Sequence, residues 1–125
     1  MSQVSGRSVQ GGGRENQDAF YHGYHPHDKS VRLLLVLDGH SKFGRTAAQG
    51  ACRYLRNHLE LAATLAELRR DPAAALEEAF GGAHQSMRDD LRRAAVDQLG
   101  GQATVDQHGC PVWRAAPEFP WKAIQ

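Results

Sequence analysis

The chain has 125 residues, enough for one compact domain and too few for two ordinary ones. Lys and Arg total 15 against 14 Asp and Glu, and the formal net charge of +1 argues against nucleic acid or an anionic membrane as a partner. The 41% of hydrophobic residues indicate a globular chain, yet alanine is prominent among them and aromatic residues make up only 7%. We therefore expect a thin core.

Cysteine usage and the N-terminus bear on the compartment. Cys52 and Cys110 lie far apart, and the sequence has no Cys/His spacing typical of a zinc site. The N-terminus lacks the basic and apolar regions of a secretory signal, and the longest apolar run, 33–37, is far too short to span a bilayer. We expect an intracellular protein, cytoplasmic or nuclear; the sequence leaves its oligomeric state open.

The first part of the chain predicts two strands. Residues 18–24 have the aromatic content of a short strand, and 25–30 are typical of a turn or loop. Residues 31–37 form a nearly continuous apolar run. Such a run is typical of a strand that is buried on both faces.

Helical periodicity follows. Small and apolar residues predict an alanine-rich helix over 44–61, and a second helix begins with Asp71 as N-cap and Pro72 in its first turn. The adjacent Gly81 and Gly82 predict either a kink or two shorter helices. The predicted apolar stripe of this second helix consists of Leu76, Ala79, Phe80, Ala83, Met87 and Leu91.

The last part of the chain loses its periodicity. Gly100 and Gly101 are expected to end the helical region. Prolines punctuate the segment 106–125, which predicts an irregular tail, preceded at best by one short strand near 103–105.

The strongest local motif is Asp38-Gly39-His40, directly after the apolar run. A carboxylate at the end of a strand is held rigidly and suits a metal or a substrate. The glycine lets a ligand approach its carbonyl oxygen, and the histidine suits general acid chemistry near neutral pH. The alternative is a plain turn between a strand and a loop, for which Asp-Gly is common.

A second motif runs from Arg14 to Phe20 and precedes the first predicted strand. The guanidinium of Arg14 suits a phosphate, and the carboxylate of Asp18 suits a metal that prefers oxygen ligands. The alternative is a solvated polar loop.

In this order, the two motifs resemble the opening of the metal-dependent serine/threonine protein phosphatases of the PPM (type 2C) family. There an Arg-x-x-(Met/Asn)-(Glu/Gln)-Asp motif precedes a Phe-Asp-Gly-His-Gly-Gly motif, and a small-residue helix follows, as Ala47 and Ala48 do here. The resemblance covers about residues 3 to 105. It implies an α+β fold: an incomplete β-sandwich of few antiparallel strands, with two packed helices and an irregular C-terminal tail.

The resemblance also implies a reaction, the hydrolysis of phosphoserine or phosphothreonine in a phosphoprotein by water that two Mn²⁺ or Mg²⁺ ions activate. By this resemblance Asp38 matches the aspartate that bridges the two ions, and Gly39 the glycine whose carbonyl ligates one of them. Asp18 matches an aspartate on the water shell of the metal cluster. His40 matches the proposed general acid, and Arg14 the phosphate-binding arginine.

Beyond Val105 the family pattern has no counterpart. The Gly-Asp-Ser-Arg strand and the later Asp-Gly and Asp-Asn motifs, which supply the remaining metal carboxylates, are absent from this sequence. We therefore expect residues 1–105 to represent the N-terminal part of a phosphatase domain and 106–125 an irregular tail, with little or no activity in this chain alone.

Two other hypotheses stay open. A non-catalytic phosphatase-like module would bind a partner or a phosphoprotein, with Arg14 and Lys42 contacting phosphate without metals. Alternatively, the chain is an incomplete gene product that does not fold stably alone.

Two weaker signals have plain structural explanations. The histidines His22, His25 and His27 lie close together, and we interpret them as solvated turn residues because no further metal ligand completes them. The charged run 88–93 is interpreted as the solvent-exposed face of the second helix.

Overall fold

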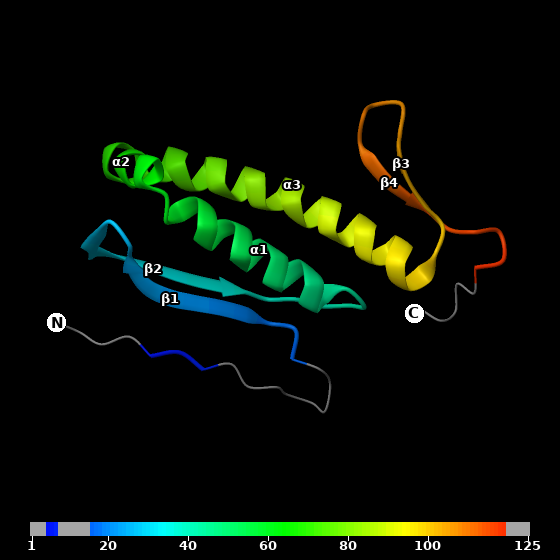
Figure 1. The fold of residues 1–125 in the computed structure, drawn as a ribbon, viewed down its shortest axis with the longest axis horizontal. Coiled ribbons are helices and arrows are strands. Elements are labelled where there is room, and N and C mark those ends of the chain that lie inside the picture. The colour runs from blue at the N-terminus through cyan, green and yellow to red at the C-terminus, as the bar shows by residue number, and fades with distance from the viewer. Residues whose placement is uncertain (1–4, 8–15, 120–125) are drawn as a thin grey trace.

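The computed structural model describes residues 5–7 and 16–119, and it confirms the α+β class. Three helices and two small antiparallel sheets of two strands each make up this part of the chain, with no closed barrel (Figure 1). The elements in chain order are β1 (Ala19–His25), β2 (Asp28–Leu37), α1 (Gly44–Leu59), α2 (Ala62–Arg70), α3 (Pro72–Leu99), β3 (Gln102–Val105) and β4 (Pro111–Arg114).

The first hairpin is formed by β1 and β2. Its register runs from Ala19 opposite Leu37 at the open end to Tyr24 opposite Arg32, with an irregularity before the turn. Successive side chains of a strand point to opposite faces. Leu33 faces the helices and is 7% exposed, whereas Leu34 and Val36 are 61% and 87% exposed. The prediction of a strand buried on both faces is therefore wrong, because the helices cover only one face, and residues 5–7, which lie near Phe20 on the other face, leave Leu34 and Val36 exposed.

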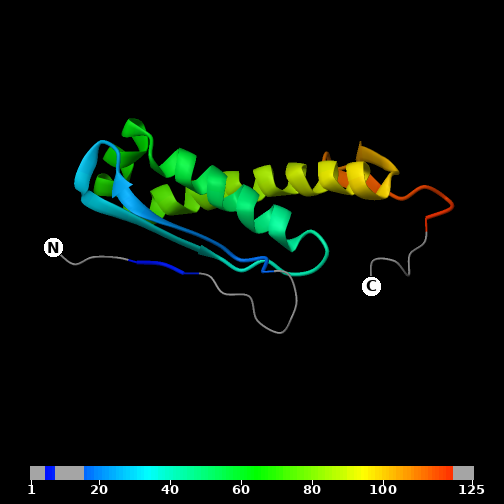
Figure 2. The same cartoon turned by 60° about the horizontal axis from the view of Figure 1, so that its bottom comes forward.

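Helix α1 lies between the hairpin and α3, as the two views of the ribbon show (Figures 1 and 2). Its Leu55 and Leu59 are buried against Leu33 of the hairpin and against alanines of α3. The small residues of α1 let α3 approach closely: a side chain at Gly50 would press against the carboxylate of Asp90. The core is small, as the alanine-rich composition predicts.

Helix α2 was not predicted from the sequence. It begins after Leu61, whose side chain makes no capping hydrogen bond, so the usual signal of a helix start is missing. In contrast, the predicted start of α3 is confirmed: the Asp71 carboxylate accepts a hydrogen bond of 3.2 Å from the Ala74 N–H, and Pro72 occupies the first turn.

Helix α3 continues through Gly81 and Gly82 without the predicted interruption. Gly82 lies against the Tyr54 hydroxyl of α1, where a Cβ would clash, whereas nothing lies near Gly81. The side chains of α3 that face the core are small, and Phe80 of the predicted stripe is 59% exposed. No helix in the described part of the chain is both long and apolar enough to cross a membrane.

A second hairpin, β3 and β4, follows α3, so the prediction of an irregular tail is wrong for Pro111–Arg114. The Asp106 carboxylate orders the turn by accepting hydrogen bonds from the N–H groups of His108 and Cys110, at 2.8 and 2.9 Å. Phe119, beyond the hairpin, packs edge to face against Trp113 of β4, with ring centroids 5.3 Å apart. Trp113 also donates a hydrogen bond from its indole N–H to the Gly100 carbonyl oxygen.

One histidine of the predicted solvated cluster is in fact buried. His25 is 1% exposed, and its Nδ1 accepts a hydrogen bond from the His27 N–H at 3.1 Å. Since Nδ1 accepts, Nε2 carries the proton and donates it to the Leu59 carbonyl oxygen at 2.9 Å. The neutral ring thus joins the hairpin turn to the end of α1.

Candidate functional site

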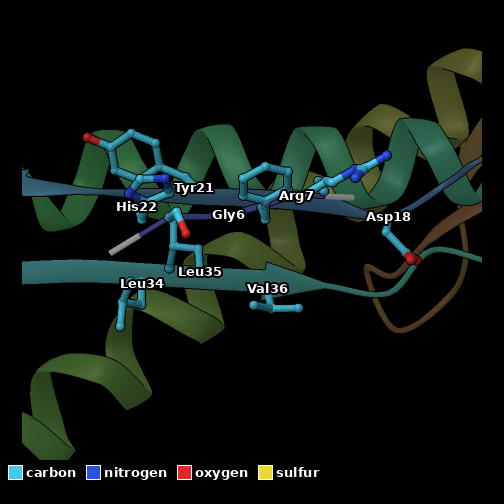
Figure 3. Close-up of a pocket in the computed structure, with 11 residues that line it drawn as sticks. Gly6, Arg7, Asp18, Tyr21, His22, Leu34, Leu35 and Val36 are labelled. Carbon is cyan, nitrogen blue, oxygen red and sulfur yellow. The ribbon is translucent and has the colours of Figure 1, made fainter. Parts of the chain in front are cut away.

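Asp18 and Asp38 lie at the same end of the first hairpin. Asp18 directly precedes Ala19, Asp38 directly follows Leu37, and Ala19 and Leu37 are register partners. Both carboxylate residues are exposed. Figure 3 shows Asp18 at this end of β1, away from the hairpin turn. The fold therefore brings the two sequence motifs to one place.

The loop after Asp38 is held against the first motif. The Gln17 side-chain amide donates a hydrogen bond of 2.6 Å to the Ser41 carbonyl oxygen. A Cβ at Gly39 would clash with the carbonyl oxygens of Gln17 and Gly44, so the close approach of these backbones requires glycine. Ser41 adopts a positive φ of 68°, which marks a sharp change of chain direction.

Asp38, Gly39 and His40 line a hollow of about 640 Å³ between this loop and the C-terminal half of α3. Arg88 and Arg92 of α3 line the same hollow. Both are only partly exposed, and Arg92 pairs with Asp89 at 3.5 Å. The interpretation of the run 88–93 as a solvent-exposed face missed these two residues. The only signal for them would have been their helical spacing, four residues apart, together with knowledge of how α3 packs on α1.

Asp18 lines two other hollows, and Asp38 lines neither of them. One, of about 310 Å³, lies between residues 5–7 and the hairpin face away from the helices, and Figure 3 shows it in close-up. The other, of about 570 Å³, is shared with Arg45 and the flank of α1. The structure therefore places Asp18 and Asp38 at one end of the hairpin but not in one hollow. Arg14, the predicted phosphate-binding residue, lies outside the described residues.

The predicted metal ligands Asp18, Asp38 and Gly39 offer oxygen atoms, the donors that Mn²⁺ and Mg²⁺ prefer. They are too few for a centre of two ions. Within residues 5–7 and 16–119, no group of three or more His, Cys, Asp or Glu side chains could hold a metal ion. The donor set is thus right in kind and incomplete in number.

Comparisons of the chain with protein-family models, with curated proteins and with solved structures found no match.

Proposed function

We propose that the chain supplies the N-terminal part of a metal-dependent serine/threonine phosphatase domain of the PPM type. The observation that carries the proposal is the juxtaposition of the two motifs: Asp18 precedes β1 and Asp38 follows β2 at the same end of the hairpin, and Gln17 joins the motifs by its bond to Ser41. Register alone does not require the loop after Asp38 to fold back on the first motif. That it does so supports a common role for the two segments.

The surroundings of His40 suit a phosphorylated substrate. Arg88 and Arg92 line the hollow of Asp38 and His40, and guanidinium groups bind phosphate oxygens strongly. In this proposal the arginines orient the phosphoryl group, and His40 donates a proton to the alkoxide of the departing serine or threonine. Asp38 and the Gly39 carbonyl contribute oxygen ligands to a centre that needs further carboxylates.

The face of the first hairpin that points away from the helices supports the proposal that the fold is an incomplete β-sandwich. Phe20 and Tyr24 on β1 and Leu34 and Val36 on β2 are all exposed large hydrophobic residues. An antiparallel sheet with apolar residues on both faces is typical of a layer that another layer covers. A second sheet is the covering layer that the proposal requires.

Because the donor set is incomplete, we propose that this chain alone does not turn over substrate. The test is an assay with a phosphothreonine peptide and millimolar Mn²⁺, in which released phosphate is expected to stay at the level of a sample without protein. Phosphate release that disappears in Asp38→Ala, and persists in a matched Asp97→Ala variant, would contradict inactivity. Asp97 is a suitable control because it is an exposed carboxylate on α3.

The same peptide separates the phosphatase proposal from a non-catalytic binding module. If the site belongs to a metal centre, calorimetry should detect peptide binding only in the presence of Mn²⁺, and a chelator should abolish it. Binding of equal strength in a chelator, lost when Arg88 and Arg92 are replaced by Gln, would favour the module and count against the phosphatase proposal.

A further inference from the structure

A groove lined by several arginines runs along β1 and includes Asp18. It has a volume of about 570 Å³ and lies between the first half of β1 and one flank of α1. We refer to it as the β1–α1 groove. The lining residues that matter here are Ala19 and Tyr21 of β1 and Arg45, Gln49, Arg53 and Arg56 of α1.

Three guanidinium groups and the carboxylate of Asp18 line the β1–α1 groove, and the Arg56 guanidinium also pairs with the Glu60 carboxylate at 3.2 Å. The chain as a whole carries a net charge of only +1, so this concentration of positive charge is local. The groove also contains Cys52, whose thiol pKa is raised by burial, an effect that Arg56 opposes. The thiol therefore stays neutral near pH 7 and does not offset the arginines.

The wall opposite these arginines is formed by Ala19, Phe20 and Tyr21, which follow one another along β1. Within the described residues, β1 pairs with β2 alone, so the backbone N–H and C=O groups along its second edge have no strand partner there. A strand edge is a template for an added extended segment, whose backbone groups continue the ladder. The groove thus combines a backbone template with a positively charged wall.

The geometry of α1 sets the length of such a segment. From Arg45 to Arg56 the helix rises about 17 Å, which corresponds to about five residues of extended chain. The side chains of an added strand alternate in direction, so every second residue would face α1. Acidic residues at those positions would meet Arg45 and Arg53, whereas Arg56 already pairs with Glu60.

We propose that the β1–α1 groove binds an acidic segment of a partner protein, added in extended conformation to the edge of β1. Nucleic acid is the less favoured polyanion, because the aromatic surface is already used. The Arg56 guanidinium lies 4.1 Å from the centroid of the Tyr21 ring, and Phe20 stacks with His22, so neither ring is a free platform for bases. This proposal goes beyond the phosphatase proposal and does not depend on it.

The test uses a fluorescein-labelled peptide of alternating glutamate and valine, with binding followed by anisotropy in a chelator, so that no metal contributes. The double variant Arg45→Glu/Arg53→Glu should weaken binding about tenfold or more, since two attractive contacts become repulsive. The control Arg70→Glu/Arg93→Glu has the same net charge, alters exposed helix arginines outside the groove, and should change binding by less than about twofold. Equal losses in the two variants would overturn the proposal.

Three further experiments test whether the double variant folds, whether the peptide adds as a strand, and whether nucleic acid binds instead. If circular dichroism shows that the double variant has lost helix, the single variant Arg53→Gln replaces it, with Arg70→Gln as its control. Peptides N-methylated on alternate residues test strand addition: one methylated set should lose binding and the other should keep it, because only one set faces the β1 edge. Equal binding of both sets, or tighter binding of a single-stranded oligonucleotide, would contradict the proposal.

Discussion

The Gln17 side-chain amide donates a 2.6 Å hydrogen bond to the Ser41 carbonyl oxygen, and this bond joins the segment before β1 to the loop after β2. It explains why an amide stands at this position. A carboxylate there could only accept hydrogen bonds, and it would repel the carbonyl oxygen of Ser41. The identity of Gln17 is therefore tied to the conformation of the loop that carries Gly39 and His40.

The first prediction follows from that bond. Gln17→Glu should lower the free energy of unfolding by about 1–2 kcal/mol at neutral pH, through the lost bond and the added repulsion. The loss should shrink below the ordinary pKa of glutamate, about 4.3, where the protonated carboxyl group can donate again. Urea denaturation at both pH values measures this, with Gln49→Glu on the exposed surface of α1 as the control. An equal loss at both pH values would contradict the role assigned to the bond.

Glycine substitutions test how tightly the loop is packed. Gly39→Ala should destabilise the chain by about 1–3 kcal/mol, because its Cβ would clash with the carbonyl oxygens of Gln17 and Gly44, which are backbone atoms with little room to move. Gly81→Ala should have the opposite sign and stabilise the chain by up to about 1 kcal/mol, since Gly81 lies within α3 and faces open space. Thermal unfolding of the two variants compares them directly; a stable Gly39→Ala variant would argue against the described loop.

The two neighbouring histidines should respond differently to substitution. His25→Ala leaves the Leu59 carbonyl oxygen and the His27 N–H without their partner and opens a buried space, so a loss of about 2–4 kcal/mol is expected. His27→Ala removes an exposed ring and should change stability by less than about 0.5 kcal/mol. Denaturant titration of both variants checks the contrast. Similar small effects in both variants would contradict the buried and hydrogen-bonded position of His25.

The Tyr21 phenol should make the folding stability depend on pH in the alkaline range. Desolvation by burial raises the pKa of the Tyr21 phenol above its ordinary value of 10.0, and the hydrogen bond that it donates to Glu60 adds to the effect. Because the folded pKa is the higher one, this contribution to stability is present below the unfolded pKa and is lost as pH rises through the folded pKa. Above pH 10, stability should fall more steeply in the wild type than in Tyr21→Phe. Parallel curves for the two proteins would show that Tyr21 makes no such contribution.

The local signals that depend on a few neighbouring residues predicted the structure best. The Asp71 cap follows from capping chemistry, the start of α1 from helical periodicity, and the end of β2 at Leu37 from composition. The predicted turn over 25–30 is too long, since β2 already begins at Asp28. Helix α2 was missed because Leu61 provides no capping side chain. The predicted break at Gly82 failed because the missing side chain makes room for Tyr54 of another helix, a contact that the local sequence does not contain.

The same distinction applies to the candidate site. Asp18, Asp38, Gly39 and His40 could be named from two short motifs, and the hairpin register places them at one end. Arg88 and Arg92 reach that end only through the packing of α3 on α1, so their place in the hollow could not be inferred from the charged run itself. The exposure of Leu34 and Val36 likewise depends on which layers cover the hairpin.

The most direct test of the central claim, that Asp38 belongs to a partial metal site, is a Mn²⁺ titration followed by electron paramagnetic resonance, which reports the free ion. We expect weak binding by the wild type, with a Kd of about 0.1–1 mM, because the site offers few charged ligands. The binding should be lost in Asp38→Asn and kept in Asp97→Asn. Binding of equal strength in all three proteins, or no binding by the wild type, would contradict the claim.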